Sequence, residues 1–184
     1  LVVGASRASA DRWYEHYARA EAALEREDHQ TAIEELTSAL ERRGDSGARV
    51  RTYGMRATAY FPYLKLGIAY FQAAEYDAAL RAFDTEERLG AIQESEEASA
   101  ELARYRQLAA DALERRRVDE RNAFDDIVRQ NLQEARALQS EGRLGDALAA
   151  VGRALSLTPE DPAANELASA LRTELNQQNE ARVR

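Results

Sequence analysis

The segment from Ala91 to Glu141 contains neither glycine nor proline over 51 residues. Glycine and proline punctuate the turns of β-rich folds and the ends of helices, so a segment this long without them predicts helix. The whole chain shares this shortage, with nine glycines and three prolines among 184 residues, and it is rich in alanine, the strongest helix former. Because 45% of the residues are apolar, the chain can bury a core. The sequence therefore predicts an all-α fold.

The apolar pattern within this segment changes phase partway along. One apolar stripe occupies residues 102–113 and another occupies 124–138, and Val118 is the single apolar residue between Glu114 and Asn122. Either two helices meet there, or one long helix crosses solvent. The two stripes consist of Leu102, Tyr105, Leu108, Ala109, Ala112 and Leu113, and of Phe124, Ile127, Val128, Leu132, Ala135 and Leu138.

Periodicity and turn residues place further helices elsewhere in the chain. Their expected ranges are about 11–26, 30–43, 62–73, 76–89, 144–157 and 162–178. Pro62 and Pro162 suit the first turn of a helix, and Asp161 is a good N-cap. Residues 45–60 have two glycines and no firm period, which predicts a linker or irregular insertion. Residues 1–8 could be a strand, a frayed end or the remnant of a leader.

A repeat pattern is the most specific feature of the sequence. From Tyr63 the chain reads Tyr-x2-Leu-Gly-x2-Tyr, followed by Ala79-x3-Phe83. This is the pattern of the tetratricopeptide repeat (TPR), and the chain resembles a TPR protein here. The resemblance implies that Gly67 and Ala79 are small because two helix axes approach closely. It also implies that Tyr70 and Phe83 fill the wedge between helices.

Two weaker copies of the pattern flank this one, at residues 128–161 and at about 13–46. The alanines that mark the second helix of each pair are Ala32, Ala79 and Ala147, which lie 47 and 68 residues apart. The longer spacing equals two repeats of about 34 residues, but the block between lacks the required small residues and phenylalanine. We therefore expect three helix pairs. The matching residues are Gly142, Leu144, Ala147, Val151, Ala154 and Pro159 in one copy and Ala20, Leu24, Ala32, Leu36 and Ala39 in the other.

The resemblance implies an all-α, TPR-like α-α superhelix of about three helix pairs with a long helical insertion. The expected division is an irregular N-terminal end at 1–10, a degenerate TPR-like pair at 11–44, a linker at 45–61, a pair at 62–90, a long helical segment at 91–127, a pair at 128–161, and a capping helix or the start of a further repeat at 162–184.

The residues offer no recognisable catalytic or metal-binding arrangement. Without cysteine there is no disulfide framework and no thiolate chemistry. His16 and His29 belong to no Glu-x-x-His pair, so both are expected to be lone, exposed side chains. The carboxylates alternate with arginines as on a solvated helix face, and no phosphate-binding or nucleophile motif is found. The sequence thus predicts a protein that is not an enzyme and has no cofactor.

Charge and hydropathy narrow the classes of partner. The 33 acidic and 25 basic residues give a net charge of −8, which argues against binding to a nucleic-acid backbone. No stretch approaches the length of a membrane span. A protein or peptide partner remains. The resemblance implies that it would lie on the concave surface made by the first helix of each pair.

The TPR positions that face a bound peptide can be assigned in each copy. They fall on Tyr14, Tyr17, Ala18 and Glu21 in the first, on Phe61, Leu64, Lys65 and Ile68 in the second, and on Arg129, Leu132, Gln133 and Arg136 in the third. No copy carries the asparagine-containing set that clamps a terminal carboxylate. The surface therefore suits an amphipathic helix or extended segment. The candidate partner-binding residues are Tyr14, Tyr17, Phe61, Leu64, Lys65, Ile68, Phe71, Arg129, Gln133 and Arg136.

An alternative is that the chain covers part of this surface itself. The helix expected at 62–73 is apolar on nearly every side, which is typical of a helix buried by its own protein. In that case Leu64, Ile68 and Phe71 pack on residues 102–113.

The sequence thus predicts a non-catalytic interaction scaffold or adaptor that docks a partner peptide, helix or neighbouring domain. Two alternatives stay open. The chain could be a regulatory or substrate-recruiting domain of a larger enzyme whose active site lies elsewhere, or an oligomerising helical scaffold that uses residues 91–141. The preference for arginine over lysine indicates the codon bias of a GC-rich genome, and we expect a bacterial source. The absence of cysteine suits the cytoplasm and the bacterial periplasm equally. The ends of the chain suggest a fragment of a longer protein. Oligomeric state is left open.

Overall fold

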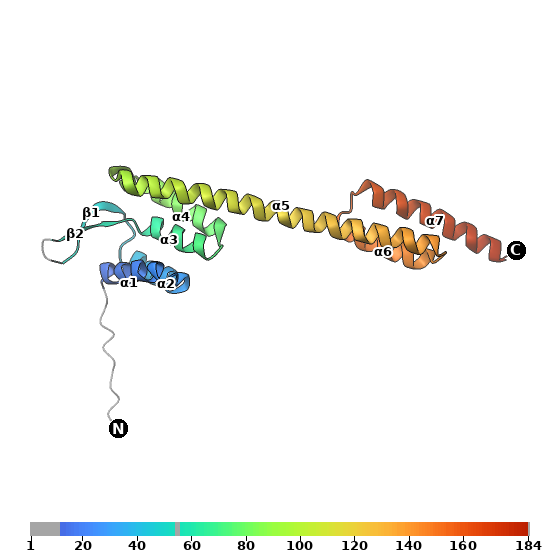
Figure 1. The fold of residues 1–184 in the computed structure, drawn as a ribbon, viewed down its shortest axis with the longest axis horizontal. Helices are drawn as coiled ribbons and strands as arrows, with labels where there is room; N and C mark the ends of the chain where they lie inside the picture. The colour runs from blue at the N-terminus through green and yellow to red at the C-terminus, as the bar shows by residue number, and fades with distance from the viewer. Residues whose placement is uncertain (1–11, 54–55, 184) are drawn as a thin grey trace, which may run out of the picture. The chain divides into compact units, whose positions relative to one another are not determined.

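The computed structural model describes residues 12–53 and 56–183 (Figure 1). In this part of the chain the elements are α1 (Trp13–Glu25), α2 (His29–Arg42), β1 (Gly47–Arg51), β2 (Ala57–Tyr60), α3 (Pro62–Gln72), α4 (Tyr76–Leu89), a 3-10 turn (Ala91–Glu94), α5 (Glu96–Ser140), α6 (Leu144–Leu157) and α7 (Pro162–Val183). The all-α, TPR-like prediction is confirmed, with one small hairpin added. The irregular end expected at 1–10 lies outside the described residues.

The chain divides into two compact units, with the boundary between Arg115 and Arg116. Unit 1 comprises the residues up to Arg115 and unit 2 the residues from Arg116 onward. Helix α5 contributes residues to both units, and every residue from Glu114 to Ile127 is exposed. Of the two alternatives for this segment, the structure has one continuous helix.

In each of three helix pairs, a three-residue turn of the same kind connects the first helix to the second. The turns lie at 26–28, 73–75 and 141–143, and their middle residues Glu27, Ala74 and Gly142 all have positive φ, of 59°, 59° and 74°. The residue that follows each of them donates its N–H to the carbonyl five residues earlier, at 2.8–2.9 Å. This is the Schellman arrangement, in which one left-handed residue reverses the chain. Its threefold recurrence identifies three equivalent helix pairs.

The alanine that marks each second helix is fully buried. Ala32, Ala79 and Ala147 are each 0% exposed, and each donates its N–H at 3.0 Å to the carbonyl four residues earlier, at the last residue of the turn. Because alanine has no side chain beyond Cβ, the second helix of each pair can lie close to the first. The 47- and 68-residue spacings in the sequence therefore correspond to equivalent positions in space.

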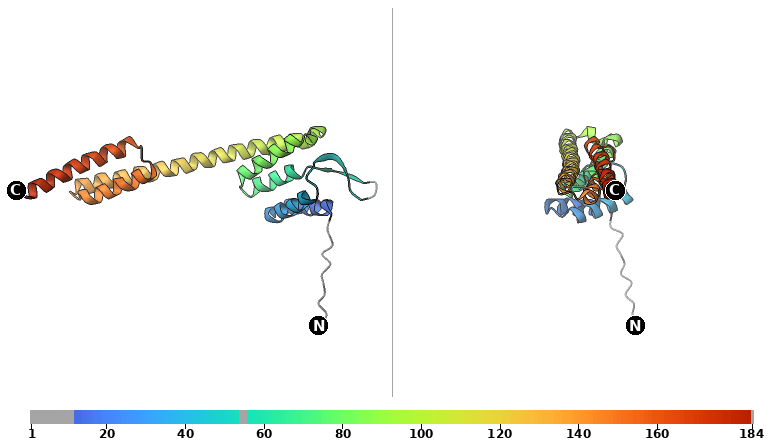
Figure 2. Two further views of the ribbon diagram at one scale, coloured as in Figure 1. Left: turned by 180° about the vertical axis from the view of Figure 1, so that it is seen from behind. Right: turned by 90° about the vertical axis from the view of Figure 1, so that its right-hand side faces the viewer.

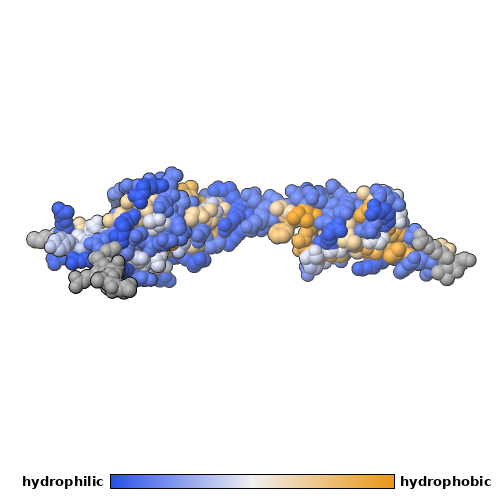
Figure 3. Space-filling view, turned by 90° about the horizontal axis from the view of Figure 1, so that it is seen from below, coloured by the Kyte–Doolittle hydropathy of each residue, from blue (hydrophilic) through white to orange (hydrophobic). Residues whose placement is uncertain are grey.

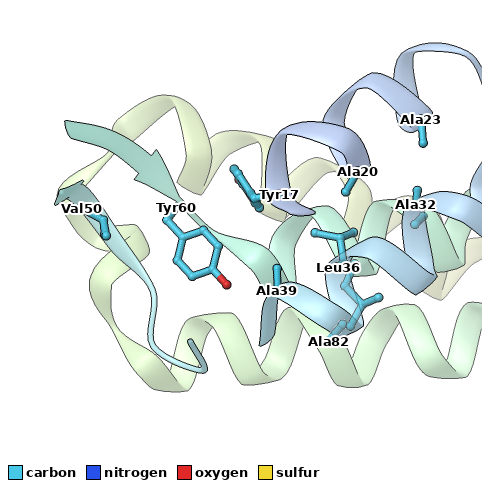
Figure 4. Packing of buried hydrophobic residues seen from close by; sticks show 11 residues of the cluster. Tyr17, Ala20, Ala23, Ala32, Leu36, Ala39, Val50, Tyr60 and Ala82 are labelled. Carbon is cyan, nitrogen blue, oxygen red and sulfur yellow. The ribbon is translucent and has the colours of Figure 1, made fainter. Parts of the chain in front are cut away.

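Figure 2 shows the ribbons of the first two helix pairs and the hairpin of unit 1. Residues of these elements form one of the buried clusters of the unit. Helix α2 packs on α3, and α1 packs on α2. Figure 4 shows Tyr17 of α1 and Tyr60 of β2 beside the small residues Ala20 and Ala39 on facing helices. The two tyrosine rings meet edge to face with centroids 4.9 Å apart, a favoured aromatic geometry.

The linker expected at 45–61 is corrected by the structure. Strands β1 and β2 pair antiparallel there, with Val50 opposite Thr58 and a register irregularity between Gly47 and Val50. A two-stranded hairpin is marginal in isolation, so it depends on tertiary contacts. Tyr60 supplies them: it is 0% exposed, and its hydroxyl donates to the Arg43 carbonyl oxygen at 2.8 Å.

Gly67 on α3 is small for a reason slightly different from the expected one. A Cβ built on Gly67 would lie 2.6 Å from Cδ1 and 2.8 Å from Cζ of Phe83, and closer still to Cε1. No real side chain makes such contacts, so any residue larger than glycine must displace the ring. The close neighbour is thus the Phe83 side chain, one turn beyond Ala79 on α4, rather than the backbone at Ala79.

The first turns of α5 cover the outer face of α3. Ile68 of α3 belongs to one buried cluster with Leu102 and Ala109 of α5, and the Phe71 ring lies 5.6 Å from that of Tyr105. The chain therefore fills part of the surface that a partner could otherwise use. This agrees with the alternative in which Leu64, Ile68 and Phe71 pack on residues 102–113 of the same chain. Unit 2 has its own core, formed by α6, α7 and the C-terminal part of α5.

His16 is buried, although the sequence predicts an exposed side chain. It sits on the face of α1 that meets α2, where its Nδ1 lies 2.6 Å from Oε2 of Glu35. Arg19 donates to Oε1 of the same carboxylate at 2.9 Å, and this hydrogen bond, together with His16, lowers the pKa of Glu35 despite partial burial. The triad joins α1 to α2 and is a structural contact.

Candidate functional site

Two adjoining hollows in unit 1 form a groove between α1, α3, the hairpin and the start of α5. The larger hollow has a volume of about 580 Å³ and the smaller of about 220 Å³. They share Tyr17, Glu21 and Thr58, so we name them together the hairpin groove. The larger is lined by Tyr14, Tyr17, Ala18, Glu21, Thr52, Tyr53, Arg56 and Thr58. The smaller is lined by Tyr17, Glu21, Thr58, Ala59, Phe61, Leu64, Lys65, Ser95, Glu97, Ala98 and Glu101.

The floor of the groove is formed by residues on one face of α1 and by residues around the start of α3. On α1 the lining residues Tyr14, Tyr17, Ala18 and Glu21 are spaced by three or four positions and so lie on one face. Around the start of α3, residues 61, 64 and 65 follow the same rule. These are the peptide-facing positions that the repeat pattern assigns in the first two copies.

The larger hollow is aromatic at its rim. Tyr53 is 72% exposed, and the guanidinium of Arg12 lies 5.9 Å from the ring centroid of Tyr14 and 5.8 Å from that of Tyr53. Arg12 also donates through Nη1 to the Tyr14 hydroxyl at 2.9 Å. A cation near two aromatic rings is favoured by the ring quadrupoles, and Arg12 of the chain itself occupies this position, so the rim offers aromatic surface that is already paired with a cation.

The smaller hollow is rich in carboxylates. Glu21, Glu97 and Glu101 line it, and Lys65 pairs with Glu101 at 2.9 Å. The pKa of Glu21 is raised, first by desolvation and also by the Glu25 and Glu101 carboxylates, while Lys65 opposes the shift. Negative charge therefore exceeds positive charge in this hollow, and the Glu21 carboxylate lies in an environment unfavourable to its charge.

Tyr17 joins the two hollows. Its hydroxyl accepts a hydrogen bond from the N–H of Phe61 at 3.4 Å, which ties α1 to the start of α3. Desolvation raises the pKa of Tyr17 well above its usual value, and the nearby Glu21 adds to the shift. The phenol is therefore neutral across the physiological range and serves as a fixed polar point in the floor.

The structure brings together five of the ten predicted partner-binding residues in the hairpin groove, and the other five lie elsewhere. The five together are Tyr14, Tyr17, Phe61, Leu64 and Lys65. Ile68 is 5% exposed, and Phe71 packs against Tyr105 and Tyr76. Arg129, paired with Asp126 at 2.7 Å, belongs to unit 2 together with the exposed Gln133 and Arg136.

The walls of the groove were not predicted from the sequence. Thr52, Tyr53, Arg56 and Thr58 come from the hairpin, and the residues at 95–101 come from the start of α5. One signal for the hairpin was available: residues 48–53 alternate small or apolar with polar side chains and end before Gly54. The wall formed by α5 depends on tertiary packing and has no local signal.

Unit 2 carries a hollow of its own, with a volume of about 480 Å³. Its lining combines exposed apolar side chains with charges of both signs: Arg117, Glu120, Arg121, Phe124, Asp125, Leu157 and Thr158. Figure 3 shows apolar side chains, in orange, gathered on the surface of unit 2.

No helix within residues 12–53 and 56–183 combines the length and hydropathy that a membrane crossing requires. In those same residues, no three His, Asp or Glu side chains are grouped in a way that could hold a metal ion.

The repeated turns and buried alanines define the class of this protein as a TPR-like helical-repeat protein. Neither a protein-family model nor a curated protein matches the chain. Among solved structures the chain is similar to the Arabidopsis OM64 TPR domain, with a TM-score of 0.40 and 14% sequence identity. That likeness covers 88% of this chain and 94% of that chain.

Proposed function

We propose that this chain is a non-catalytic interaction module that docks an extended segment of a partner protein in the hairpin groove. The observation that carries the proposal is the convergence of two repeat copies on one pair of hollows. Tyr14 and Tyr17 from the first copy and Phe61, Leu64 and Lys65 from the second line adjoining spaces of about 580 and 220 Å³. The larger space is mainly apolar and the smaller is rich in carboxylates, and concave spaces that combine apolar surface with polar groups are where ligands and peptide side chains bind.

Filling the groove tests the proposal. Ala18 is exposed and lines the larger hollow, so Ala18→Trp should block the hollow without entering the core. Peptides are first selected from an unbiased linear library on the purified full chain, and their dissociation constants are then measured. We expect Ala18→Trp to weaken binding at least tenfold with an unchanged Tm.

The matched control is Ala103→Trp, which places the same bulk on an exposed alanine of α5 that lines neither hollow. It should bind the peptides as the parent chain does. Equal affinity of the Ala18→Trp variant and the parent chain would show that partners do not use the groove.

A second candidate function, an oligomerising helical scaffold, is favoured by the surface of unit 2. Phe124 is 53% exposed, Ile127 44% and Leu157 39%, which is unusual for large apolar side chains close together. The hollow there is bordered by arginines at 117 and 121 and by acidic residues at 120 and 125. A patch with an apolar centre and both signs of charge is complementary to itself, as an interface between two copies must be. The occupant that we propose is a second copy of the chain.

Light scattering after size exclusion at increasing protein concentration tests this second function. We expect a dimer that dissociates into monomers when Phe124→Ser and Leu157→Ser are combined. Since both side chains are exposed, the substitutions should leave the helical content unchanged. A parent chain that stays monomeric at high concentration would exclude the scaffold function.

A further inference from the structure

The charges that line the hairpin groove indicate which kind of partner segment it can bind. The inference from them rests on the proposed function. The smaller hollow contains three carboxylates, Glu21, Glu97 and Glu101, against one ammonium, Lys65. Lys65 is already held by Glu101 at 2.9 Å. Within residues 12–53 and 56–183, neither Glu21 nor Glu97 has an ion-pair partner within 4 Å.

Glu21 is an exposed residue shared by the two hollows, and Lys65 only partly offsets the effects that raise its pKa. It stands between the two hollows, and both desolvation and neighbouring carboxylates disfavour its ionised form. A cation beside it would offset both effects, because opposite charges interact more strongly where water is partly excluded. In the smaller hollow a carboxylate of the partner would have to displace Lys65 from Glu101 to gain a cation, and the other cation lining the groove, Arg56, lies on the larger hollow.

The larger hollow is suited to a different side chain. It is lined by three tyrosines, Ala18 and Glu21, with Thr52, Arg56 and Thr58 on the hairpin side, so its two charges balance. Tyrosine rings bury large apolar area and pack well against aromatic or aliphatic groups. Because the two hollows share Tyr17, Glu21 and Thr58, one short segment can reach both.

From this charge complementarity we infer that the partner is a basic segment. It places a lysine or arginine between Glu21 and Glu97 in the smaller hollow and an aromatic or aliphatic side chain in the larger. The net charge of −8 on the whole chain attracts such a segment from a distance and repels acidic ones. This preference is opposite to that of a carboxylate clamp, which requires basic groups in the groove.

The test is the composition of the selected peptides and their response to charge removal. We expect the library selection to enrich lysine and arginine and to deplete aspartate and glutamate. A selected peptide should bind the combined Glu21→Gln and Glu97→Gln variant at least tenfold more weakly. Its affinity should also fall as salt rises from about 0.01 M to about 0.15 M, since the screening length shrinks from about 30 Å to about 8 Å.

The control removes the same two charges elsewhere. Glu160→Gln combined with Glu166→Gln alters two exposed residues of unit 2 and should leave affinity within twofold of the parent value. If the selected peptides are acidic or uncharged but Ala18→Trp still blocks them, the basic-segment inference is wrong and the docking function stands. If Ala18→Trp blocks none of them, the docking function itself fails.

Discussion

Replacing Gly67 with leucine should unfold unit 1 or destabilise it by about 3 kcal/mol, the upper part of the range for overpacked cores. The first atom of any side chain at this position would overlap the Phe83 ring, which is itself 0% exposed and surrounded by the core. Neither helix can retreat freely, because α3 also packs on α2 and is covered by α5. Trp13, the single tryptophan, lies 4.4 Å from the Tyr60 ring in unit 1, so its fluorescence during urea unfolding reports on this unit.

Gly152 offers the matched control for this substitution. It lies inside α6, and apart from its chain neighbours and the backbone of its own helix no atom lies within 4 Å of a Cβ built there. Gly152→Leu should therefore be neutral or stabilise its helix by up to about 1 kcal/mol through helix propensity. Combining Gly67→Leu with Phe83→Ala should cost about 1 kcal/mol less than the sum of the single changes, because the new side chain enters the space of the ring. Additive losses, or an unchanged midpoint for Gly67→Leu, would contradict the steric explanation.

The sequence predicted the helix pairs well because their signals are local. Pro62 begins α3, Gly142 occupies a left-handed turn position, and Asp161 caps α7 by accepting the N–H of Ala164 at 2.7 Å. Each of these depends on a residue and its immediate neighbours. The alanines of the second helices were found for the same reason, since repeat spacing is a property of the sequence itself.

Two features were harder to predict for physical reasons: the hairpin, and the fact that α5 is one continuous helix. Strand β2 consists of Ala57-Thr58-Ala59-Tyr60, and alanine has a low strand propensity. What holds the strand is Tyr60, buried against helices from other parts of the chain. In α5 the apolar pattern lapses between Glu114 and Asn122, and a lapse of this kind is equally compatible with a turn and with an exposed helix. The groove was therefore predicted only where the resemblance to the TPR pattern assigns peptide-facing positions, on α1 and around the start of α3.

Removing the Glu86 carboxylate should destabilise unit 1 almost as strongly as the change at Gly67. Glu86 lies on α4 and is 0% exposed, and its Oε2 accepts the N–H groups of Tyr63 and Leu64 at 3.0 and 3.1 Å. Helix α3 has no side-chain cap from its own N-cap residue, Phe61, so Glu86 supplies the cap from the neighbouring helix. Glu86→Leu would leave the N–H groups of Tyr63 and Leu64 without an acceptor, which costs about 1–3 kcal/mol for each group. Removing the buried charge of Glu86 offsets part of this cost. We expect a net loss of about 3 kcal/mol in the unfolding free energy reported by Trp13.

Glu86→Gln separates the capping role from the charge, because the amide oxygen can still accept both N–H groups. Burial raises the pKa of Glu86 above its ordinary value of 4.5, although the Ser46 hydroxyl and the two N–H groups oppose the shift. Between the ordinary and the raised pKa the folded chain binds more protons at Glu86 than the unfolded chain does, so this residue makes stability fall as pH rises. The Gln variant lacks this contribution. The stability of the parent chain relative to Glu86→Gln should therefore decline as pH rises from about 4 through this window and then level off. Parallel pH profiles for the two chains would show that the buried carboxylate has the same pKa in the folded and unfolded states.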